Sequence, residues 1–302
     1  MLFVVLELYG QKVSDNASAE WLIKRFDVSN YTFIMRENRD DEIGVVNLHS
    51  YRKIFSSRKK IINLVKQSEK IWFRLPSPKV LLVFMLAKNH LKHKSVHIHF
   101  CANRMTYKYL KSNFSGPNLF RFIYGKFVKT YFKNKNNFNY YYTGSHVKNN
   151  FNLSKDSKYI VDQVTLELSQ VNGYGNCYFG RFFKLKDPSF LSFLNKNKIS
   201  VDCYGSGVFP ESKNLINKGL LSSEKVMLTL NKYEGIVFPG HEYFEGFPRV
   251  LYQAIILKKK IYIDSSSTFV DDIVWYDRLN FYDKILKRKK GNKFDLKKLN
   301  SL

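Results

Sequence analysis

The sequence predicts two doubly wound α/β domains, each built on a parallel sheet with helices on both faces. Strand-like and helix-like segments alternate along the chain, which is typical of βαβ units, and the alternation restarts after residue 150. With 302 residues and a hydrophobic fraction of 44%, the chain can form two cores of ordinary size. We expect domains at residues 1–150 and 151–302, facing each other across a cleft.

The elements of the first half follow from short apolar runs and from helical spacing. Residues 2–6 are an apolar run ended by Glu7, which predicts a buried first strand rather than a leader peptide. Further strands are expected at residues 31–35, 70–73, 95–101 and 140–143. Helices are expected at residues 17–25, 58–66, 80–89 and 119–133. This alternation predicts a parallel sheet.

The segment 119–133 has the clearest amphipathic pattern in the chain. Its apolar positions share one helical face and are Phe120, Ile123, Tyr124, Phe127, Val128 and Tyr131. Arg121, Lys126, Lys129 and Lys133 supply positive charge. Two interpretations stay open, a core-facing helix with a solvated basic side and a helix lying on a membrane surface. We favour the first, because Gly125 weakens an autonomous surface helix.

The second half repeats the pattern after a polar stretch at residues 149–157, which we expect to link the domains. Strands are expected at residues 176–182, 200–204, 235–238 and 260–263. Helices are expected at residues 188–195, 226–232 and 248–257. We therefore predict a second copy of the same architecture rather than one large sheet.

The net charge and the number of cysteines limit which partners and which cellular compartment are expected. The net charge of +25 favours phosphate-bearing partners, although abundant Lys, Asn, Phe, Tyr and Ile also fit compositional drift from AT-rich coding. The basic stretch 284–302 is either a solvated tail or a contact for anionic lipid.

Three widely spaced cysteines indicate a reducing compartment. Because no apolar run approaches the roughly 20 residues of a membrane span, we expect a cytoplasmic protein, peripheral on the membrane at most.

The segment from Phe244 to Ala254 carries the strongest functional signal. Gly246 lets a ligand approach the backbone, and Pro248 suits the first turn of a helix. The N–H groups of that turn and the helix dipole favour an anion. Glu245 places a carboxylate beside this phosphate site. A nucleotide-sugar requires both features, one for its hydroxyl groups and one for its diphosphate.

Two further motifs lie where expected strands end. Gly180 permits a tight turn before Arg181, whose planar guanidinium suits phosphate oxygens, and Lys186 adds a second cation. Gly205 and Gly207 end the next expected strand. Open parallel sheets bind ligands at the carboxyl ends of their strands, so these motifs belong to one candidate site.

In this order and spacing, residues 176–264 resemble the nucleotide-sugar domain of glycosyltransferase family four, which has the GT-B fold. That family shows Gly-Arg-Leu, then Lys-Gly, a strand ending Gly-x-Gly, Pro-Ser, and Glu-Gly-Phe-Pro leading to a second Glu. The matching segments here are Gly180-Arg181-Phe182, Lys186-Asp187, Gly205-Ser206-Gly207, Pro239-Gly240 and Glu245-Gly246-Phe247-Pro248, leading to Gln253.

The resemblance implies roles for these positions. Arg181 and Lys186 would hold the donor diphosphate and stabilise it as leaving group, so neither a metal ion nor another cofactor is expected. Glu245 would contact hydroxyls of the transferred sugar. The backbone of Phe247, Pro248, Arg249 and Val250 would surround a phosphate. Gln253 replaces the family's ribose-binding Glu and loses its charge-assisted hydrogen bond, which predicts weaker nucleotide binding or help from other groups.

The first half resembles the family in architecture and at two positions. Gly10 follows the first expected strand, where relatives carry a glycine-rich turn facing the donor. His99 would be the counterpart of the family's N-terminal active-site histidine, with His97 as the rival. Strand alternation puts only these two histidines on one face, so the nearby His90 and His93 complete no metal site with them.

The resemblance implies a retaining transfer of a sugar from a nucleotide-sugar donor. A basic chain suits a lipid-pyrophosphate-linked saccharide as acceptor, as in bacterial O-antigen, lipopolysaccharide or capsule assembly. Two other functions stay open. One is a basic nucleic-acid-binding protein, although no nucleic-acid module is present and we expect no nucleic-acid partner. The other is a relative that binds nucleotide without catalysis, because of Gln253.

Overall fold

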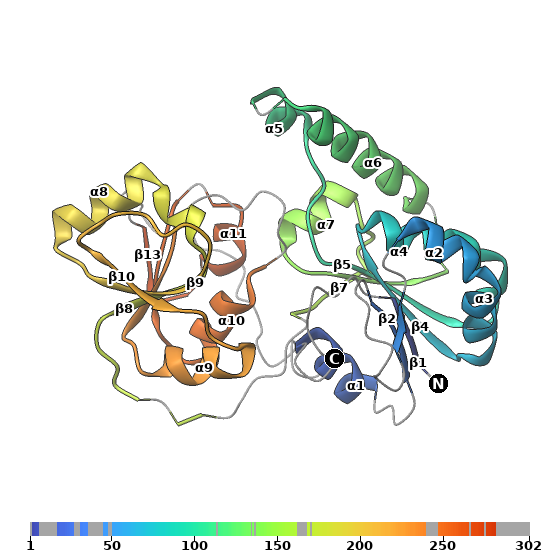
Figure 1. Ribbon diagram of the computed structural model, residues 1–302, viewed down its shortest axis with the longest axis horizontal. Coiled ribbons are helices and arrows are strands. Elements are labelled where there is room, and N and C mark those ends of the chain that lie inside the picture. Colours follow the sequence, from blue (N-terminus) through green and yellow to red (C-terminus); the bar gives the residue numbers. More distant parts are fainter. Residues whose placement is uncertain are drawn as a thin grey trace. The chain divides into compact units, whose positions relative to one another are not determined.

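The computed structural model describes residues 2–5, 17–26, 31–35, 45–47, 50–112, 114–133, 135, 137–161, 168–169, 171–239, 247–265, 267–274 and 276–281 (Figure 1). The chain divides into two compact units between residues 162 and 163. Each unit contains one sheet, and all strand pairs in both sheets are parallel. The predicted fold class is confirmed at this level.

The first sheet has the strand order β3-β2-β1-β4-β5-β6-β7. Its strands are β1 (Leu2–Val5), β2 (Tyr31–Met35), β3 (Val45–Asn47), β4 (Lys70–Leu75), β5 (Ser95–Phe100), β6 (Asn139–Tyr142) and β7 (Lys158–Tyr159). The order reverses at β1 and β4, as in doubly wound folds. The strands expected at 31–35, 70–73, 95–101 and 140–143 are all present, with ends shifted by one or two residues.

Helices cover both faces of this sheet. They are α1 (Ala17–Phe26), α2 (Tyr51–Ser56), α3 (Arg58–Gln67), α4 (Pro78–Ala87), α5 (Tyr107–Ser112), α6 (Gly116–Phe132) and α7 (Ser145–Phe151). Phe26 of α1 packs against Trp72, whereas Phe84 of α4 packs against Phe73. Because neighbouring residues of a strand point to opposite faces, these contacts place α1 and α4 on opposite sides of β4 (Figure 1).

The amphipathic segment forms α6, but its apolar residues divide between two environments. Val128 and Phe132 are buried in the core, where Phe132 contacts Phe84. In contrast, Phe120 and Phe127 are exposed. The expectation that the whole apolar face turns to the core is therefore wrong for its outward part. The apolar arc is wider than the contact that α6 makes with the core.

The second sheet has the order β10-β9-β8-β11-β12-β13. Its strands are β8 (Asn176–Arg181), β9 (Val201–Ser206), β10 (Leu215–Gly219), β11 (Gly235–Phe238), β12 (Lys260–Ile263) and β13 (Leu279–Phe281). Its helices are the 3-10 helix η3 (Phe182–Lys186), α8 (Pro188–Asn197), α9 (Ser223–Asn231), α10 (Arg249–Ile256) and α11 (Val270–Ile273). Figure 1 shows α8 and α9 on opposite faces of this sheet.

The expected linker at residues 149–157 belongs to the first unit instead. The helix α7 reaches Phe151, and β7 then pairs with β6 through Tyr141 and Lys158. The first unit therefore extends beyond the expected boundary at residue 150. The polar composition of this stretch comes from an exposed helix end and a short edge strand.

Candidate functional site

The second sheet opens between its two central strands. β8 and β11 pair only through Asn176 with Gly235 and Cys177 with Ile236, at the start of each strand. Toward their carboxyl ends the two strands no longer pair, and the strand order reverses at this point. Ligands of open α/β sheets bind in the crevice that such a reversal creates. The candidate site therefore lies beyond the ends of β8 and β11.

Two glycines allow β8 and β9 to approach closely beside this crevice. Gly180 pairs with Gly205, and a Cβ atom on Gly205 would lie 1.7 Å from the Gly180 carbonyl oxygen. Gly180 has a φ of 154°, and the Tyr178 hydroxyl donates to the Arg181 carbonyl at 2.7 Å. Gly205 is thus required by backbone packing. The predicted substrate contacts of Gly205 and Gly207 stay predictions.

The cations after β8 are arranged by the 3-10 helix η3. Residues three apart share a face of such a helix, and Phe182 and Leu185 occupy the buried face. The same period turns Lys184 and the exposed Lys186 away from this buried face. The structure thus adds Lys184 to the cations near the end of β8, a residue that the sequence motif did not single out. The three-residue period was the signal available in the sequence.

Lys184 is directed toward the neighbouring strand. Its Nζ lies 5.5 Å from the centroid of the Phe238 ring, at the end of β11. Phe238 packs edge-to-face on Phe269, which packs in the same way on Phe247 before α10. One cation after β8 therefore reaches the end of β11, and an aromatic chain connects that end to the start of α10.

Asp187 takes the place of the glycine that follows the lysine in the resembling family. Its carboxylate accepts from the N–H groups of Ser189 and Phe190 at 2.9 and 3.4 Å. Pro188 occupies the first turn of the same helix. Asp187 is therefore an N-cap that begins α8 and holds the end of η3.

The helix α10 begins as predicted, with Pro248 as its N-cap and no side-chain cap. The N–H groups of Leu251 and Tyr252 donate to the Pro248 carbonyl at 3.1 and 3.3 Å. The first N–H groups of a helix make no bond to its own carbonyls, and a helix start of this kind suits an anion. Phe247 is buried. Glu245 and Gly246 lie outside the described residues, so their roles stay predictions.

Gln253 is on α10 but is only 3% exposed. Leu251 and Ala254 beside it are buried as well. A ribose contact by the Gln253 amide therefore requires access that this conformation does not offer. Its predicted role as the ribose ligand stays a prediction.

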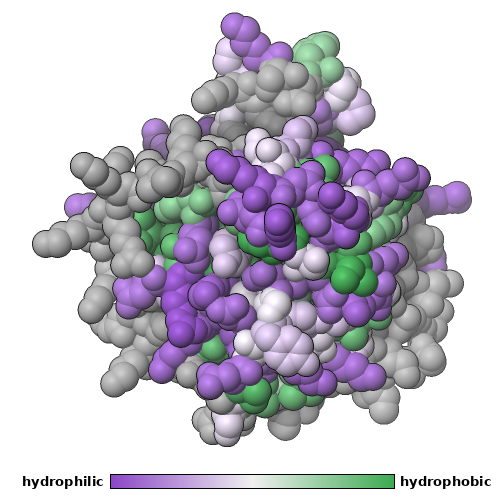
Figure 2. Space-filling view, turned by 90° about the vertical axis from the view of Figure 1, so that its left-hand side faces the viewer, coloured by the Kyte–Doolittle hydropathy of each residue, from purple (hydrophilic) through white to green (hydrophobic). Residues whose placement is uncertain are grey.

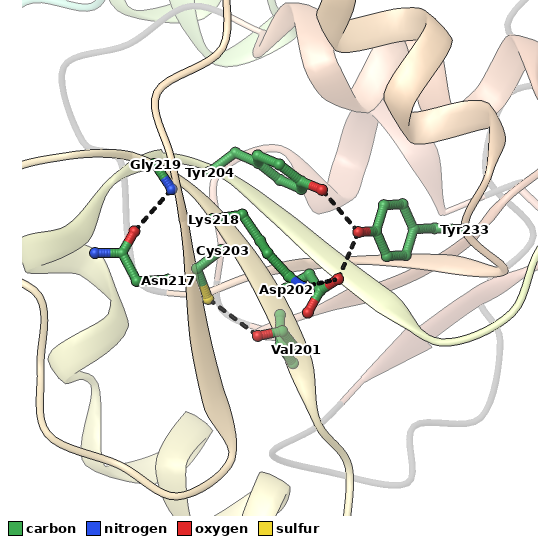
Figure 3. A network of polar contacts seen from close by, with 8 residues as sticks. All are labelled: Val201, Asp202, Cys203, Tyr204, Asn217, Lys218, Gly219 and Tyr233. Atoms are coloured by element: carbon green, nitrogen blue, oxygen red, sulfur yellow. Dashed lines mark hydrogen bonds and ion pairs between the residues drawn. The ribbon is translucent and has the colours of Figure 1, made fainter.

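A polar network joins β9 to β10 and to Tyr233, which follows α9, and the sequence did not reveal it (Figure 3). The Tyr233 hydroxyl donates to Asp202 at 2.6 Å and contacts the Tyr204 hydroxyl at 2.9 Å. Lys218 pairs with Asp202 at 3.5 Å. Burial, followed by the hydrogen bonds to Asp202 and Tyr204, raises the pKa of Tyr233. Tyr204 in turn stacks on Phe179, next to Gly180. The network therefore holds the side of β9 that contacts β8 through this ring pair.

In the first unit, His97 and His99 lie on β5 and on the same face, as alternation requires. His99 is fully buried and its Nε2 lies 2.7 Å from the Thr143 hydroxyl. His97 bonds Ser95 and Tyr141 at 3.0 and 3.1 Å. Both rings belong to an aromatic layer around Trp72. Gly10 lies outside the described residues.

The described residues provide neither a cluster of metal ligands nor a membrane-spanning helix. No group of three or more His, Cys, Asp or Glu side chains among them could hold a metal ion. No described helix is both long and apolar enough to cross a bilayer.

No protein-family model matches the chain, and no curated protein matches it significantly. Solved structures do match. An E. coli trehalose-6-phosphate protein bound to UDP-2-fluoro glucose has a TM-score of 0.58 at 7% identity, over 93% of this chain and 88% of its own. AviGT4, a glycosyltransferase of avilamycin A biosynthesis, has a TM-score of 0.52 at 8% identity, over 94% and 85%.

A UDP-GlcNAc 2-epimerase from Methanocaldococcus jannaschii matches with a TM-score of 0.50 at 12% identity, over 96% of this chain and 94% of its own. All these sequence identities are too low to show a family. The TM-scores over nearly the whole chain show that the fold is shared. The chain has the GT-B fold, and its structure is similar to those of nucleotide-sugar glycosyltransferases.

Proposed function

We propose that this chain is a glycosyltransferase that takes a sugar from a nucleotide-sugar donor. The observation that carries the proposal is the open switch point of the second sheet, where Arg181 ends β8, Lys184 follows in η3, and the start of α10 follows β11 in the chain. Cations and helix N–H groups at one crevice suit a diphosphate. Among similar structures, one is bound to UDP-2-fluoro glucose.

In the proposed reaction the bond between the anomeric carbon and the diphosphate oxygen breaks, and a bond to an acceptor hydroxyl oxygen forms. The hydroxyl proton passes to the leaving phosphate. Arg181, Lys184 and Lys186 stabilise the negative charge that develops there. These fixed cations supply what a divalent ion supplies in other transferases. Retention of the anomeric configuration follows from the resemblance to family four.

For the acceptor we propose a lipid-pyrophosphate-linked saccharide of bacterial surface-polysaccharide assembly, such as O-antigen or capsule. The support is the basic character of the chain, with a net charge of +25, which suits a pyrophosphate. The cytoplasmic face of the membrane is the proposed place of reaction.

The first test is thermal stabilisation of the protein by UDP, GDP, dTDP and CMP. Ligand at about a hundredfold excess over its dissociation constant stabilises by about 2.7 kcal/mol. We expect one nucleotide to stabilise the wild type and to lose this effect in Arg181→Ala/Lys186→Ala. Lys184→Ala should also weaken it. Lys196→Ala/Lys213→Ala, which removes two exposed lysines elsewhere in the second unit, is the matched control.

A second measurement separates the classes of reaction. Release of nucleotide from the matching nucleotide-sugar, dependent on a saccharide acceptor, supports transfer. Epimerisation without an acceptor contradicts it, and the epimerase among the similar structures makes this comparison necessary. Stabilisation without any turnover supports the non-catalytic alternative. If only an oligonucleotide stabilises the protein, the site proposal is wrong.

A further inference from the structure

The helices α5 and α6 present an apolar surface to solvent, which we call the α5–α6 surface. Its members are Tyr107, Phe114, Leu119, Phe120, Ile123 and Phe127, exposed by 68, 72, 38, 61, 58 and 49%. The opposite side of α6 is packed on the unit, where Gly125 allows close contact with Arg104. The exposed apolar side chains therefore do not take part in packing α6 against its own unit.

This surface differs from ordinary exposed hydrophobic residues. Single exposed apolar side chains are normal, whereas a contiguous group marks an interaction site. Figure 2 shows the side of the molecule at the left of Figure 1, where hydrophobic residues form small patches among hydrophilic ones. On the α5–α6 surface, five large apolar residues lie on two consecutive helices, and Phe114 lies just before the second helix.

The charge around this surface has one sign. The sequence contains no Asp or Glu between Glu69 and Asp156. The basic residues of the two helices and of the cap of α6 include Lys111, Arg121, Lys126, Lys129 and Lys133. Burial, followed by Arg104 and Lys133, lowers the pKa of Lys129. Clustered cations without acidic residues nearby in sequence favour an anionic partner.

We propose that the α5–α6 surface binds an anionic lipid membrane. The apolar side chains enter the boundary between headgroups and acyl chains, and the lysine and arginine side chains extend to lipid phosphates. A second copy of the chain would bring the same cations together, which opposes self-association. Nucleic acid would neutralise the cations but would leave aliphatic Leu119 and Ile123 without a suitable contact. This proposal does not rest on the proposed glycosyl transfer.

The test is sedimentation of the full chain with phosphatidylcholine vesicles and with equimolar phosphatidylcholine–phosphatidylglycerol vesicles. We expect salt-sensitive binding to the mixed vesicles and little to the neutral ones. Phe120→Ser/Ile123→Ser/Phe127→Ser should weaken binding by about tenfold or more. The control, Val208→Ser/Leu220→Ser/Leu228→Ser, alters exposed apolar residues of the second unit and should bind as the wild type does.

A second pair of variants tests the charge. Lys126→Gln/Lys133→Gln should reduce binding to mixed vesicles by about tenfold, whereas Lys196→Gln/Lys213→Gln in the second unit should not. Absence of wild-type binding to mixed vesicles overturns the proposal, as does equal loss in the control variants. Self-association that the serine triple variant abolishes, without vesicle binding, assigns the surface to a second copy. Nucleotide stabilisation should be unchanged in the serine triple variant, so the two proposals fail separately.

Discussion

The fold controls the charge of His97. It is 7% exposed, and its ring is enclosed by Trp72, Phe26 and Tyr141. Burial, followed by the positive charges of Lys70 and Lys158, lowers its pKa from 6.5 to about 4. The folded protein therefore holds this imidazole neutral over a range in which the unfolded chain protonates it.

This difference predicts how stability depends on pH. Below pH 6.5 the imidazole of His97 becomes protonated in the unfolded chain. In the folded chain it stays neutral until the pH falls to about 4. The contribution of His97 is thus fully present above 6.5 and is lost as the pH falls toward 4. We expect the free energy of unfolding to fall by about 2 kcal/mol more between pH 7 and pH 5 in the wild type than in His97→Gln.

Urea unfolding at both pH values measures this difference. Because carboxylates titrate in both proteins, only the difference between wild type and variant is interpreted. An equal pH dependence in the two proteins would mean that His97 is protonated in the folded state at pH 5, contrary to its enclosure.

Single residues also show where sequence reasoning stopped. The spacing of Arg181 and Lys186 pointed to the end of β8, where the second sheet opens, because a glycine and two cations after an apolar run are a local pattern. It did not identify Lys184, because the pairing with Phe238 depends on β11, which is distant in sequence. The burial of His99 and Gln253 was equally out of reach, since it depends on what packs against them.

At the scale of elements, α6 shows how far a hydrophobic period determines position. The period predicted the helix and its packed residues Val128 and Tyr131. The hydrophobic period could not distinguish these packed residues from the exposed Phe120, Ile123 and Phe127. A wide apolar arc produces the same sequence pattern whether all of it or only part of it is covered by the core. Which part packs is decided by α4 and β5, through Phe84 and Phe100.

This division of α6 predicts two different costs for the same substitution. Phe132→Ala removes a ring that is 5% exposed and contacts Phe84, so it should destabilise the protein by about 3–5 kcal/mol. Phe127→Ala, five residues earlier on the exposed side, should change stability by less than about 0.5 kcal/mol. Chemical denaturation of both variants checks the assignment. Equal costs would show that the outward residues are covered within the chain.

Long, apolar elements were predicted well and short, polar ones were not. The elements predicted well include β4, β5 and α4. They are buried apolar runs, and an apolar run of this length is compatible with few positions other than the core. β10 and β7 were missed because exposed edge strands carry charged residues and lack alternation. The predicted linker failed for the same reason, since a polar edge strand and a loop have similar compositions.

At the scale of the whole molecule, both sheets reverse their strand order after the third strand, but their carboxyl ends carry different chemistry. In the second unit the reversal is flanked by glycines, by cations and by the start of α10, whose N-cap is Pro248. In the first unit the described residues at the ends of β4 and β5 include a proline turn after β4 and the buried His99 within β5. The fold alone offers two possible crevices, and the side chains favour the second.

This asymmetry predicts where a bound nucleotide protects the backbone from hydrogen exchange. The nucleotide identified by thermal stabilisation should slow exchange in residues 176–186 and 247–256, which flank the crevice. For amides that exchange only from a state unable to bind, the slowing approaches about a hundredfold at a hundredfold excess of ligand. Residues 70–75 and 95–100 of the first sheet should change far less, because their strand ends contribute no comparable phosphate ligands.

Arg181→Ala/Lys186→Ala should remove the protection at the same ligand concentration, while Lys196→Ala/Lys213→Ala should keep it. Protection confined to the first sheet would place the nucleotide beside His99 and would contradict a donor site built on β8 and α10.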